Sequence, residues 1–292
     1  MRKHPRSLNF KYGVLSRGSS LGRKYIERKL KEMSYVIKKN YAHKSNYGES
    51  RNMATVKYCV WHYTGNDGDT DEANANYFTS PNRQASAHRF IDDNSITCSV
   101  KFTRVAWHCG HDVGGKYYHK DCRNYNSIGI ELCDTKHDGK HNISAKTRKN
   151  AVEYGRKLAV KYGFKQSEQL RHWDVTHKKC PAYWAGAKNA GWDEFRADLY
   201  EGYFIGKKYT LTTDRQVRTA AGSKKLLKRG ELTAALQKCT TADCGGKAIL
   251  KKGTTVTCKD VQYDSKGVIY IKLASGWICV KGDKGTYVKE KE

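Results

Sequence analysis

The sequence is poor in proline and has no long apolar run. Only three of its 292 residues are proline, and hydrophobic residues make up 38%. This composition argues against a collagen-like or a disordered chain. No apolar stretch approaches the roughly 20 residues that cross a bilayer, so we expect a soluble protein. The first residues, MRKHPRSLNFKYG, lack the apolar core of a secretory signal, and we expect synthesis in the cytoplasm without a signal peptide.

Acidic residues are the other scarce class. The chain has 29 Asp and Glu against 55 Lys and Arg, a formal net charge of +26. Such an excess indicates either a well-solvated surface or a polyanionic partner. Nucleic acid, an anionic cell wall and a membrane surface fit the charge equally well. The sequence has no zinc-finger, RRM or helix-turn-helix pattern, so nucleic acid is not expected as a partner.

The ten cysteines do not suit a disulfide framework, which belongs to small secreted chains. We interpret most of them as buried thiols and a minority as metal ligands. Four lie in the C-terminal third without the paired Cys-x2-Cys knuckles of a structural zinc site: Cys239, Cys244, Cys258 and Cys279. Buried thiols or an opportunistic disulfide are the expectation there.

Composition divides the chain into four parts. Residues 1–33 form a basic N-terminal extension, with Met33 as an alternative natural start. Residues 34–202 mix strands with crossover-sized helices, which predicts an α/β domain with a mixed central sheet flanked by helices. Residues 203–207 are the expected linker. Residues 208–292 carry short alternating runs between Gly and Lys turns, the pattern of a small all-β domain.

Three segments of the α/β part have clear local signatures. Residues 56–63, VKYCVWHY, are β-branched and aromatic and predict a buried strand that ends at turn residues. Residues 127–133, SIGIELC, alternate so that Glu131 projects from the opposite face to the isoleucines. The strongest helix runs from an N-cap at Ser144 to about Tyr162, with Gly163 as its C-terminal glycine. Further expected elements are strands at 86–92, 96–100, 105–109 and 169–173 and helices at 71–78 and around 192–199.

The segment RHWDVTHKKCP, residues 171–181, combines metal-ligating residue types. His172 and Cys180 are eight positions apart, and Pro181 would stiffen a return of the chain to the same point. Zinc binds imidazole and thiolate, and catalytic sites have three protein ligands with one open position. His62 ends a predicted strand at a turn, where sites of α/β folds lie. The residues alone also allow another interpretation, in which His172 is a surface histidine and Cys180 is an unrelated buried thiol.

Five motifs, taken in order, resemble those of the zinc-dependent N-acetylmuramoyl-L-alanine amidases of the type-2 class. They are VWHYTG, SAHRF, AWHCG, NSIGIEL and RHWDVTHKKCP. This class includes phage endolysins and the catalytic peptidoglycan recognition proteins. The resemblance runs over about residues 56–200. It implies that His62, His172 and Cys180 bind Zn2+ and that Glu131 and Lys178 are catalytic.

The implied reaction is hydrolysis of the amide that joins the lactyl group of N-acetylmuramic acid to L-alanine. Zinc would lower the pKa of a bound water and polarise the scissile carbonyl. Glu131 would take the proton from that water and pass it to the leaving amine. Lys178 would stabilise the oxyanion of the tetrahedral intermediate.

The sequence departs from part of the family at one position. Some members carry a tyrosine just before the histidine of the SAHRF-like motif, where this chain has Ala87, so the acid/base role falls to Glu131. The resemblance also implies substrate contacts by His88, Trp107 and His108, although packing at strand ends is an equally good interpretation. Asp174 could orient a ligand histidine, but capping a turn is the more ordinary interpretation. His111, His119 and His177 are expected to be solvated.

The C-terminal part, with VRTAAGSKKLLKRGE and GWICV, resembles the bacterial SH3-like domains that anchor cell-wall hydrolases. Such an anchor would raise the local concentration of the catalytic part on the wall. Trp277 and Tyr270 are candidate contacts, with core packing favoured for Trp277. The expected partners are bacterial peptidoglycan and, as a second candidate, anionic wall polymers; we expect a monomer with no membrane insertion.

The leading hypothesis is therefore a phage or prophage endolysin that acts on the bacterial cell wall after release from the cytoplasm. One alternative is a non-catalytic peptidoglycan-binding recognition protein, but these typically lose the thiolate ligand that Cys180 provides here. A host autolysin is the other alternative, and it would more often carry an export signal.

Overall fold

The computed structural model describes residues 35–110, 115–241 and 246–291. Tyr35–Glu292 form one compact unit. The predicted basic extension, residues 1–33, and the alternative start at Met33 lie outside the described residues. Among the described helices, none is both long enough and apolar enough to cross a bilayer.

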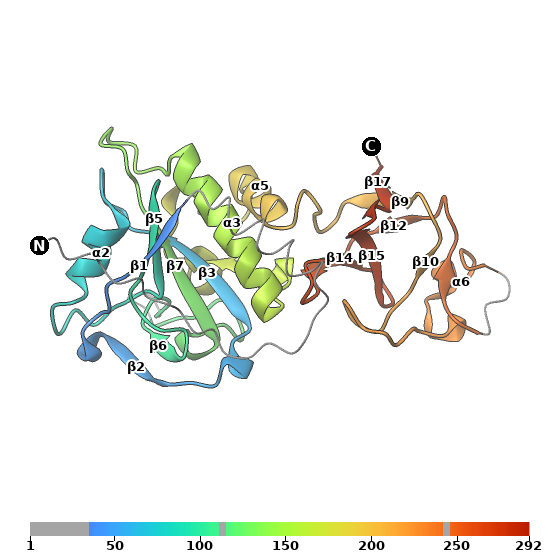
Figure 1. Ribbon diagram of the computed structural model, residues 1–292, viewed down its shortest axis with the longest axis horizontal. Coiled ribbons are helices and arrows are strands. Elements are labelled where there is room, and N and C mark those ends of the chain that lie inside the picture. The colour runs from blue at the N-terminus through green and yellow to red at the C-terminus, as the bar shows by residue number, and fades with distance from the viewer. Residues whose placement is uncertain (1–34, 111–114, 242–245, 292) are drawn as a thin grey trace, which may run out of the picture. The chain divides into compact units, whose positions relative to one another are not determined.

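The first part of the described chain is a mixed sheet with helices on it (Figure 1). Its strands are β1 (Val36–Lys39), β2 (Tyr47–Ser50), β3 (Tyr58–Tyr63), β4 (Arg89–Ile91), β5 (Ser95–Cys98), β6 (Arg104–Ala106), β7 (Ser127–Leu132) and β8 (Gln169–Arg171). Its helices are α2 (Asp71–Tyr77), α3 (Ala145–Tyr162), α4 (His172–Thr176) and α5 (Ala190–Leu199). Six strands form one sheet in the order β1-β5-β4-β7-β3-β8, and β2 pairs with β6. The predicted α/β class with a mixed central sheet is confirmed.

One face of the sheet is closed by α3 and α5, which lie side by side (Figure 1). Gly155 of α3 allows this packing, because an added Cβ would lie 2.5 Å from the Leu199 side chain and 3.0 Å from the ring of Trp61. Phe195 of α5 meets the Trp61 ring edge to face at a centroid distance of 4.8 Å. Trp61, Phe195 and Leu199 are fully buried, so this face forms a dry core.

The opposite face carries the polar side chains. In the parallel pairing of β3 with β7, Trp61 lies opposite Ile130, and the next pair is His62 with Glu131. Successive side chains of a strand point to opposite faces, so His62 and Glu131 lie together on the face away from α3. The predicted orientation of Glu131 is confirmed. The loop after β6 and helix α4 pack here through a buried cluster of Val60, Cys109, Cys122, Leu170 and Val175.

Local signals placed most elements correctly, but they did not predict β1 and β2, and they extended one strand too far. Helix α3 begins after the N-cap Ser144, whose side chain accepts from the Thr147 N–H, and ends at Gly163 in the left-handed conformation. The strand expected at 169–173 ends instead at Arg171, and α4 begins at His172. Asp174 stops the strand, because its carboxylate accepts from the Arg171 N–H at 2.8 Å and pairs with the Arg171 guanidinium at 2.6 Å. Asp174 therefore caps a helix start.

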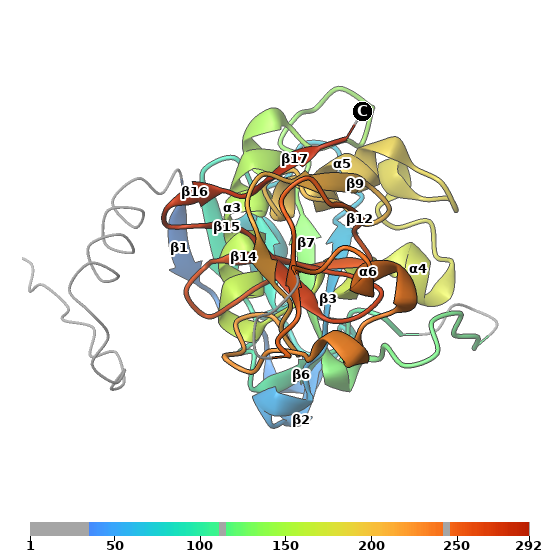
Figure 2. The ribbon, with the colours of Figure 1, turned by 90° about the vertical axis from the view of Figure 1, so that its right-hand side faces the viewer.

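The second part of the chain is rich in short strands, as predicted. They are β9 (Lys208–Leu211), β10 (Arg215–Gln216), β11 (Ile249–Leu250), β12 (Thr255–Thr257), β13 (Asp260–Tyr263), β14 (Ile269–Lys272), β15 (Trp277–Gly282), β16 (Gly285–Thr286) and β17 (Val288–Glu290), with one short helix, α6 (Ala234–Gln237). Figure 2 draws these strands in orange to red. The expected hairpin is the antiparallel pair β14 and β15. The SH3-like assignment and the domain limits stay predictions.

Candidate metal centre and active site

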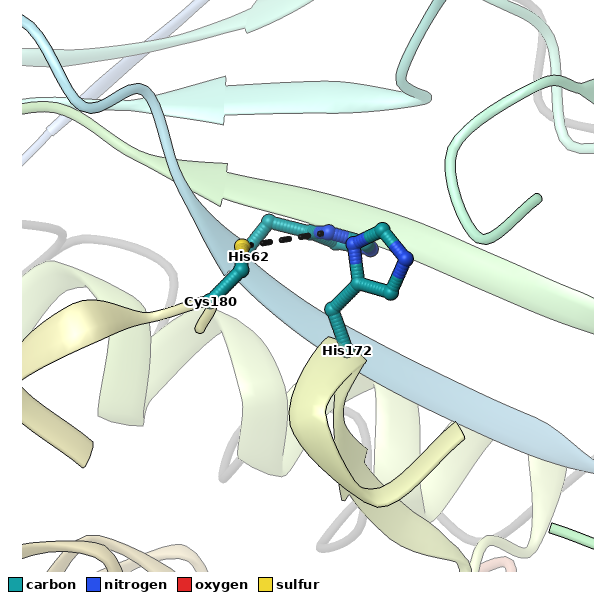
Figure 3. A group of neighbouring side chains, drawn as sticks. All are labelled: His62, His172 and Cys180. Carbon is teal, nitrogen blue, oxygen red and sulfur yellow. Dashed lines mark hydrogen bonds between the residues drawn. The ribbon is translucent and has the colours of Figure 1, made fainter. Parts of the chain in front are cut away.

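The three predicted metal ligands come from separate segments and meet on the polar face of the sheet (Figure 3). His62 lies near the end of β3, His172 begins α4, and Cys180 follows α4 in a loop. One ligand atom from each residue lies within 4.8 Å of the other two. His62, His172 and Cys180 are only 2%, 5% and 4% exposed, respectively. The structure thus brings together the set that the sequence predicted.

The spacing of this group fits a zinc ion. The Cys180 sulfur lies 3.7 Å from Nδ1 of His62. Tetrahedral zinc with a nitrogen at about 2.0–2.1 Å and a sulfur at about 2.3 Å separates these two atoms by roughly 3.6 Å. Little movement is needed for both to reach the same ion. Nε2 of His172 faces the Gly110 carbonyl oxygen at 3.5 Å, which leaves its Nδ1 for a metal.

A chain of hydrogen bonds decides which nitrogen of His62 faces the metal group. The Ser127 hydroxyl donates to the Arg123 carbonyl oxygen at 2.6 Å, so it accepts from Nε2–H of His108 at 3.1 Å. Nδ1 of a neutral His108 is then an acceptor, and it lies 3.0 Å from Nε2 of His62. His62 therefore donates through Nε2 and keeps the lone pair of Nδ1 toward Cys180. This is the arrangement that orients a metal-ligating histidine.

Gly129 makes room for this chain of bonds. A Cβ at position 129 would lie 2.3 Å from Cγ of His108, so any other residue would displace the imidazole. On the neighbouring strand, His88 is fully buried, and its Nδ1 accepts from the Gly129 N–H at 3.0 Å. Its Nε2 faces the Arg104 carbonyl oxygen at 3.1 Å. His88 and His108 both support the strand that carries Glu131.

The surroundings of the ligands keep the imidazoles neutral and the thiol protonated when no metal is present. Burial, followed by the proximity of His172, holds the pKa of His62 well below its usual range. Burial and then the Lys178 ammonium lower the pKa of His172 to about 4. Burial, followed by the Glu131 carboxylate, raises the pKa of Cys180 to about 12. A metal that enters the group must therefore displace one proton, from the thiol.

Glu131 lies next to the ligand group, since it is the register partner of His62. Burial raises its pKa to about 8; the Lys178 ammonium opposes this shift and the Asp69 carboxylate adds to it. Among the described residues its Oε2 has no hydrogen-bond partner, and it lies out of contact with solvent. A carboxyl group with a pKa near neutrality and one uncommitted oxygen is suited to acid/base chemistry.

Lys178 lies in the exposed loop between His172 and Cys180. Its ammonium lowers the pKa values of His172 and Glu131, which places its positive charge close to both. Trp107 is partly buried and packs beside Gly48 of β2, where an added Cβ would lie 3.2 Å from its indole nitrogen. Substrate contact by His88, Trp107 and His108 stays a prediction, and His88 has no exposed surface in this conformation.

Sequence reasoning missed the supporting roles of Ser127 and Gly129 and the burial of the Tyr183 hydroxyl. Ser127 and Gly129 lie in the NSIGIEL motif, but only strand pairing reveals what they contact. The hydroxyl of Tyr183 is buried without a hydrogen-bond partner among the described residues, and Tyr183 packs edge to face on Tyr63. His177, expected to be solvated, stacks on Trp173 at a centroid distance of 4.6 Å.

His119 has an ordinary structural role, and the described cysteines are mostly buried thiols. His119, also expected to be solvated, accepts from the Cys122 N–H at 2.9 Å, while His111 lies outside the described residues. Seven of the nine described cysteines are buried, and all nine are free thiols. Cys244 lies outside the described residues. In the described part of the chain, no C-terminal cysteine belongs to a group that could hold a metal.

Residues 52–183 match the family model described as N-acetylmuramoyl-L-alanine amidase. This segment contains every residue of the candidate metal centre and all five motifs. The amidase resemblance is thereby supported over these residues.

Individual relatives cover part of the chain. The N-acetylmuramoyl-L-alanine amidase BlyA of Bacillus subtilis (strain 168) is 33% identical over 139 residues, 44% of this chain and 37% of BlyA. The N-acetylmuramoyl-L-alanine amidase CwlL of Bacillus licheniformis is 30% identical over 185 residues, 61% of this chain and 50% of CwlL. The chain thus spans half or less of the length of these relatives. The structure of the catalytic domain of XlyA covers 56% of this chain and 99% of that domain, with 25% identity and a TM-score of 0.45.

Proposed function

We propose that the protein is a zinc-dependent peptidoglycan hydrolase that cleaves the amide bond between N-acetylmuramic acid and L-alanine. The observation that carries the proposal is the buried group of His62, His172 and Cys180 beside Glu131, within the residues that match the amidase family model. Three ligands and a neighbouring carboxyl group are the parts that zinc-assisted amide hydrolysis requires.

His62, through Nδ1, together with His172 and the Cys180 thiolate would hold the ion. Zinc bound there supplies a Lewis acid that activates water and polarises a carbonyl group. His108 holds His62 in the required tautomer, and Ser127 holds His108.

Glu131 moves the proton. Its carboxylate takes a proton from the attacking water, and the resulting carboxylic acid returns it to the amine that leaves with L-alanine. A pKa raised to about 8 by burial means that both forms are accessible near neutral pH. The Lys178 ammonium, on the exposed loop, neutralises the oxyanion that develops on the scissile carbonyl.

For the C-terminal part we propose an SH3-like domain that holds the enzyme on the wall. A cavity of about 510 Å³ lies there, with Arg215, Arg218 and Tyr270 in its lining. Two guanidinium groups suit an anionic wall polymer or the carboxylates of a stem peptide. Trp277 is 6% exposed and belongs to the core instead. The surplus of basic residues and the cell-wall substrate agree with an endolysin of phage or prophage origin that works as a monomer.

Digestion of purified peptidoglycan tests the activity. We expect new L-alanine amino groups without new reducing sugar ends, and loss of the activity when zinc is removed by a chelator. Reducing ends alone would indicate a glycosidase and contradict the proposal. Binding to peptidoglycan with no release of amino groups by the zinc-loaded protein would indicate a non-catalytic recognition protein.

A further inference from the structure

Two turns lie against each other at the edge of the sheet where β3 and β7 end. The turn after β3 and the turn after β7 are joined by backbone hydrogen bonds from Thr64 N–H to the Leu132 oxygen (3.1 Å) and from Asp69 N–H to the Asp134 oxygen (2.7 Å). The contact is close, because a Cβ on Gly68 would lie 3.0 Å from the side chain of His137.

These turns bring together three carboxylates that have no part in the proposed reaction. Asp67, Asp134 and Asp138 each place one carboxylate oxygen within 4.8 Å of the other two. Asp134 is only 3% exposed, whereas the side chains of Asp67 and Asp138 are 22% and 37% exposed. Three negative charges at this distance repel one another, all the more where one of them is buried.

Asp134 is the member that points to a ligand. Its Oδ1 accepts from the Lys136 N–H at 3.1 Å, but its Oδ2 is out of contact with solvent and has no hydrogen-bond partner among the described residues. A buried carboxylate oxygen without a partner is costly unless a cation or a proton satisfies it. The Asp134 carboxylate belongs to the group, so a cation bound there would lie beside this side chain and beside Asp67 and Asp138.

The positive side chains near the group are poor substitutes for such a cation. Nδ1 of His137 lies 3.4 Å from the Asp67 carboxylate and closer, at 2.9 Å, to the Asp67 backbone oxygen. The Lys140 ammonium lies 3.9 Å from the Asp138 carboxylate. The two side chains are 85% and 78% exposed. Exposed ion pairs at such distances contribute little. Asp67 is instead held in place by the N–H groups of Asp138 and Gly139, each 3.0 Å from its Oδ1.

We propose that Asp67, Asp134 and Asp138 bind a calcium ion in a second metal site. The donors are oxygens only, which selects a hard cation over zinc. The three carboxylates come from irregular turns, and calcium accepts six to eight oxygens at about 2.3–2.6 Å in flexible geometry, whereas magnesium demands a near-ideal octahedron. Water completes the coordination on the exposed side of Asp138.

The position of the site gives the ion a structural role. The turns that it joins begin directly after the strand ends that hold His62 and Glu131. An ion bound to both turns ties these ends together, so we expect calcium to stabilise the folded protein. The inference does not depend on amidase activity, since it concerns a different set of side chains.

Calorimetric titration of the zinc-loaded full-length protein with calcium chloride tests the site. A chelating resin removes divalent ions from the buffer before the protein is added. No soluble chelator is then needed, so zinc stays bound to the protein. We expect one calcium ion per chain, with a Kd on the order of 10⁻⁴ M. The melting temperature should rise by a few degrees in calcium at about fifty times this Kd. Magnesium chloride should bind at least tenfold more weakly, and equal affinity would overturn the assignment to calcium.

Matched variants locate the site. Asp138→Asn, on the most exposed ligand, should raise the Kd for calcium at least tenfold without loss of zinc, and Asp134→Asn should abolish binding. Asp193→Asn is the control, because it removes a carboxylate that pairs with Arg196 on α5, away from the turns. No heat and no thermal shift with the unaltered protein, or equal affinity in Asp138→Asn and Asp193→Asn, would overturn the proposal. If Asp134→Asn does not fold, Asp138→Asn still decides.

Discussion

Two groups of side chains that could hold a metal ion lie near the same end of β3 and β7, and they differ in donor type and in burial. His62, His172 and Cys180 offer nitrogen and sulfur, and all three are buried. The carboxylates of Asp67, Asp134 and Asp138 offer oxygen, and only Asp134 is buried. The edge of a sheet can therefore assemble either kind of site.

The strands thus decide where the side chains meet, whereas the donor atoms and the burial of the side chains decide which ion they suit. Two neutral imidazoles and one thiol suit zinc once the thiol loses its proton, because the buried set then carries one negative charge. A half-exposed set of three carboxylates suits a hard ion that keeps part of its water. Because the two groups share no side chain, a substitution in one should leave metal binding by the other unchanged.

Cys180→Ser should nearly abolish zinc binding and amidase activity together, while calcium binding at the carboxylate group is unchanged. The thiolate is the only anionic ligand of the buried set, so its loss should cost more than the roughly 10–100-fold that loss of a supporting residue costs. Metal analysis after dialysis and the release of amino groups from peptidoglycan measure the two effects. The control is Cys279→Ser, which alters a partly exposed thiol outside both groups. Full zinc occupancy in Cys180→Ser would remove this residue from the ligand set.

Glu131→Gln should keep its zinc and lose activity by about 10²–10⁴-fold, because the amide cannot accept the proton of water. Near-normal turnover would reassign the base.

The same variant should raise the stability of the metal-free protein at pH 8 and above. The folded pKa of Glu131 is about 8, raised by burial from 4.5, so the folded state binds the proton more tightly than the unfolded state. Stability from this group is present below about pH 4.5 and is lost as the pH rises through 8. Because glutamine carries no charge to bury, the free energy of unfolding at pH 8 should rise by an amount on the order of a few kcal/mol. Denaturant unfolding at pH 5 and pH 8 measures it, and the gain should be smaller at pH 5.

His108→Leu should weaken zinc binding by about 10–100-fold, since His62 loses the acceptor that fixes its tautomer. His108→Asn is the matched variant, because its side-chain oxygen can take the position of Nδ1 and should restore part of the affinity. Competition with a chromogenic zinc chelator measures both. Equal affinity in the leucine variant and the unaltered protein would show that the hydrogen bond does not orient His62.

Zinc affinity should rise about tenfold for each pH unit between pH 6 and 8. In the metal-free protein the thiol of Cys180 has a pKa raised to about 12 by burial, and the pKa of His172 is lowered to about 4. Only the thiol proton is therefore displaced by zinc in this range, and a lower pH favours the metal-free form. The chelator competition repeated at several pH values gives the slope. A slope of zero would mean that the thiolate already exists in the metal-free protein.

Local sequence signals account for much of the framework. The aromatic and β-branched run predicted β3, the Ser144 cap and Gly163 bounded α3, and the alternation around Glu131 placed it opposite the isoleucines. They erred at residues 169–173, where side-chain pairing of Asp174 with Arg171 ends the strand early. This pairing depends on how the chain turns over residues 171–174, and strand propensity takes no account of that turn.

The candidate ligands were likewise predictable as residue types, but their support was not. No local pattern shows that His108 lies over Gly129, that Ser127 holds His108, or that His88 is fully buried, because each contact joins segments far apart in the chain. The carboxylate group is the same kind of case, since Asp67 and Asp134 meet through the pairing of β3 with β7.

The sequence alone predicts most elements of the α/β part and the strong positive charge. It also places two histidines, one cysteine and one glutamate in motifs that resemble those of a zinc amidase. These follow from properties of neighbouring residues, namely periodicity, capping and side-chain chemistry. Only the tertiary structure decided which nitrogen of His62 is free, why Glu131 holds its proton up to a pKa of about 8, and that three aspartates share one turn region. The physical reason is that tautomer, burial and charge proximity are set by groups that only folding brings into contact.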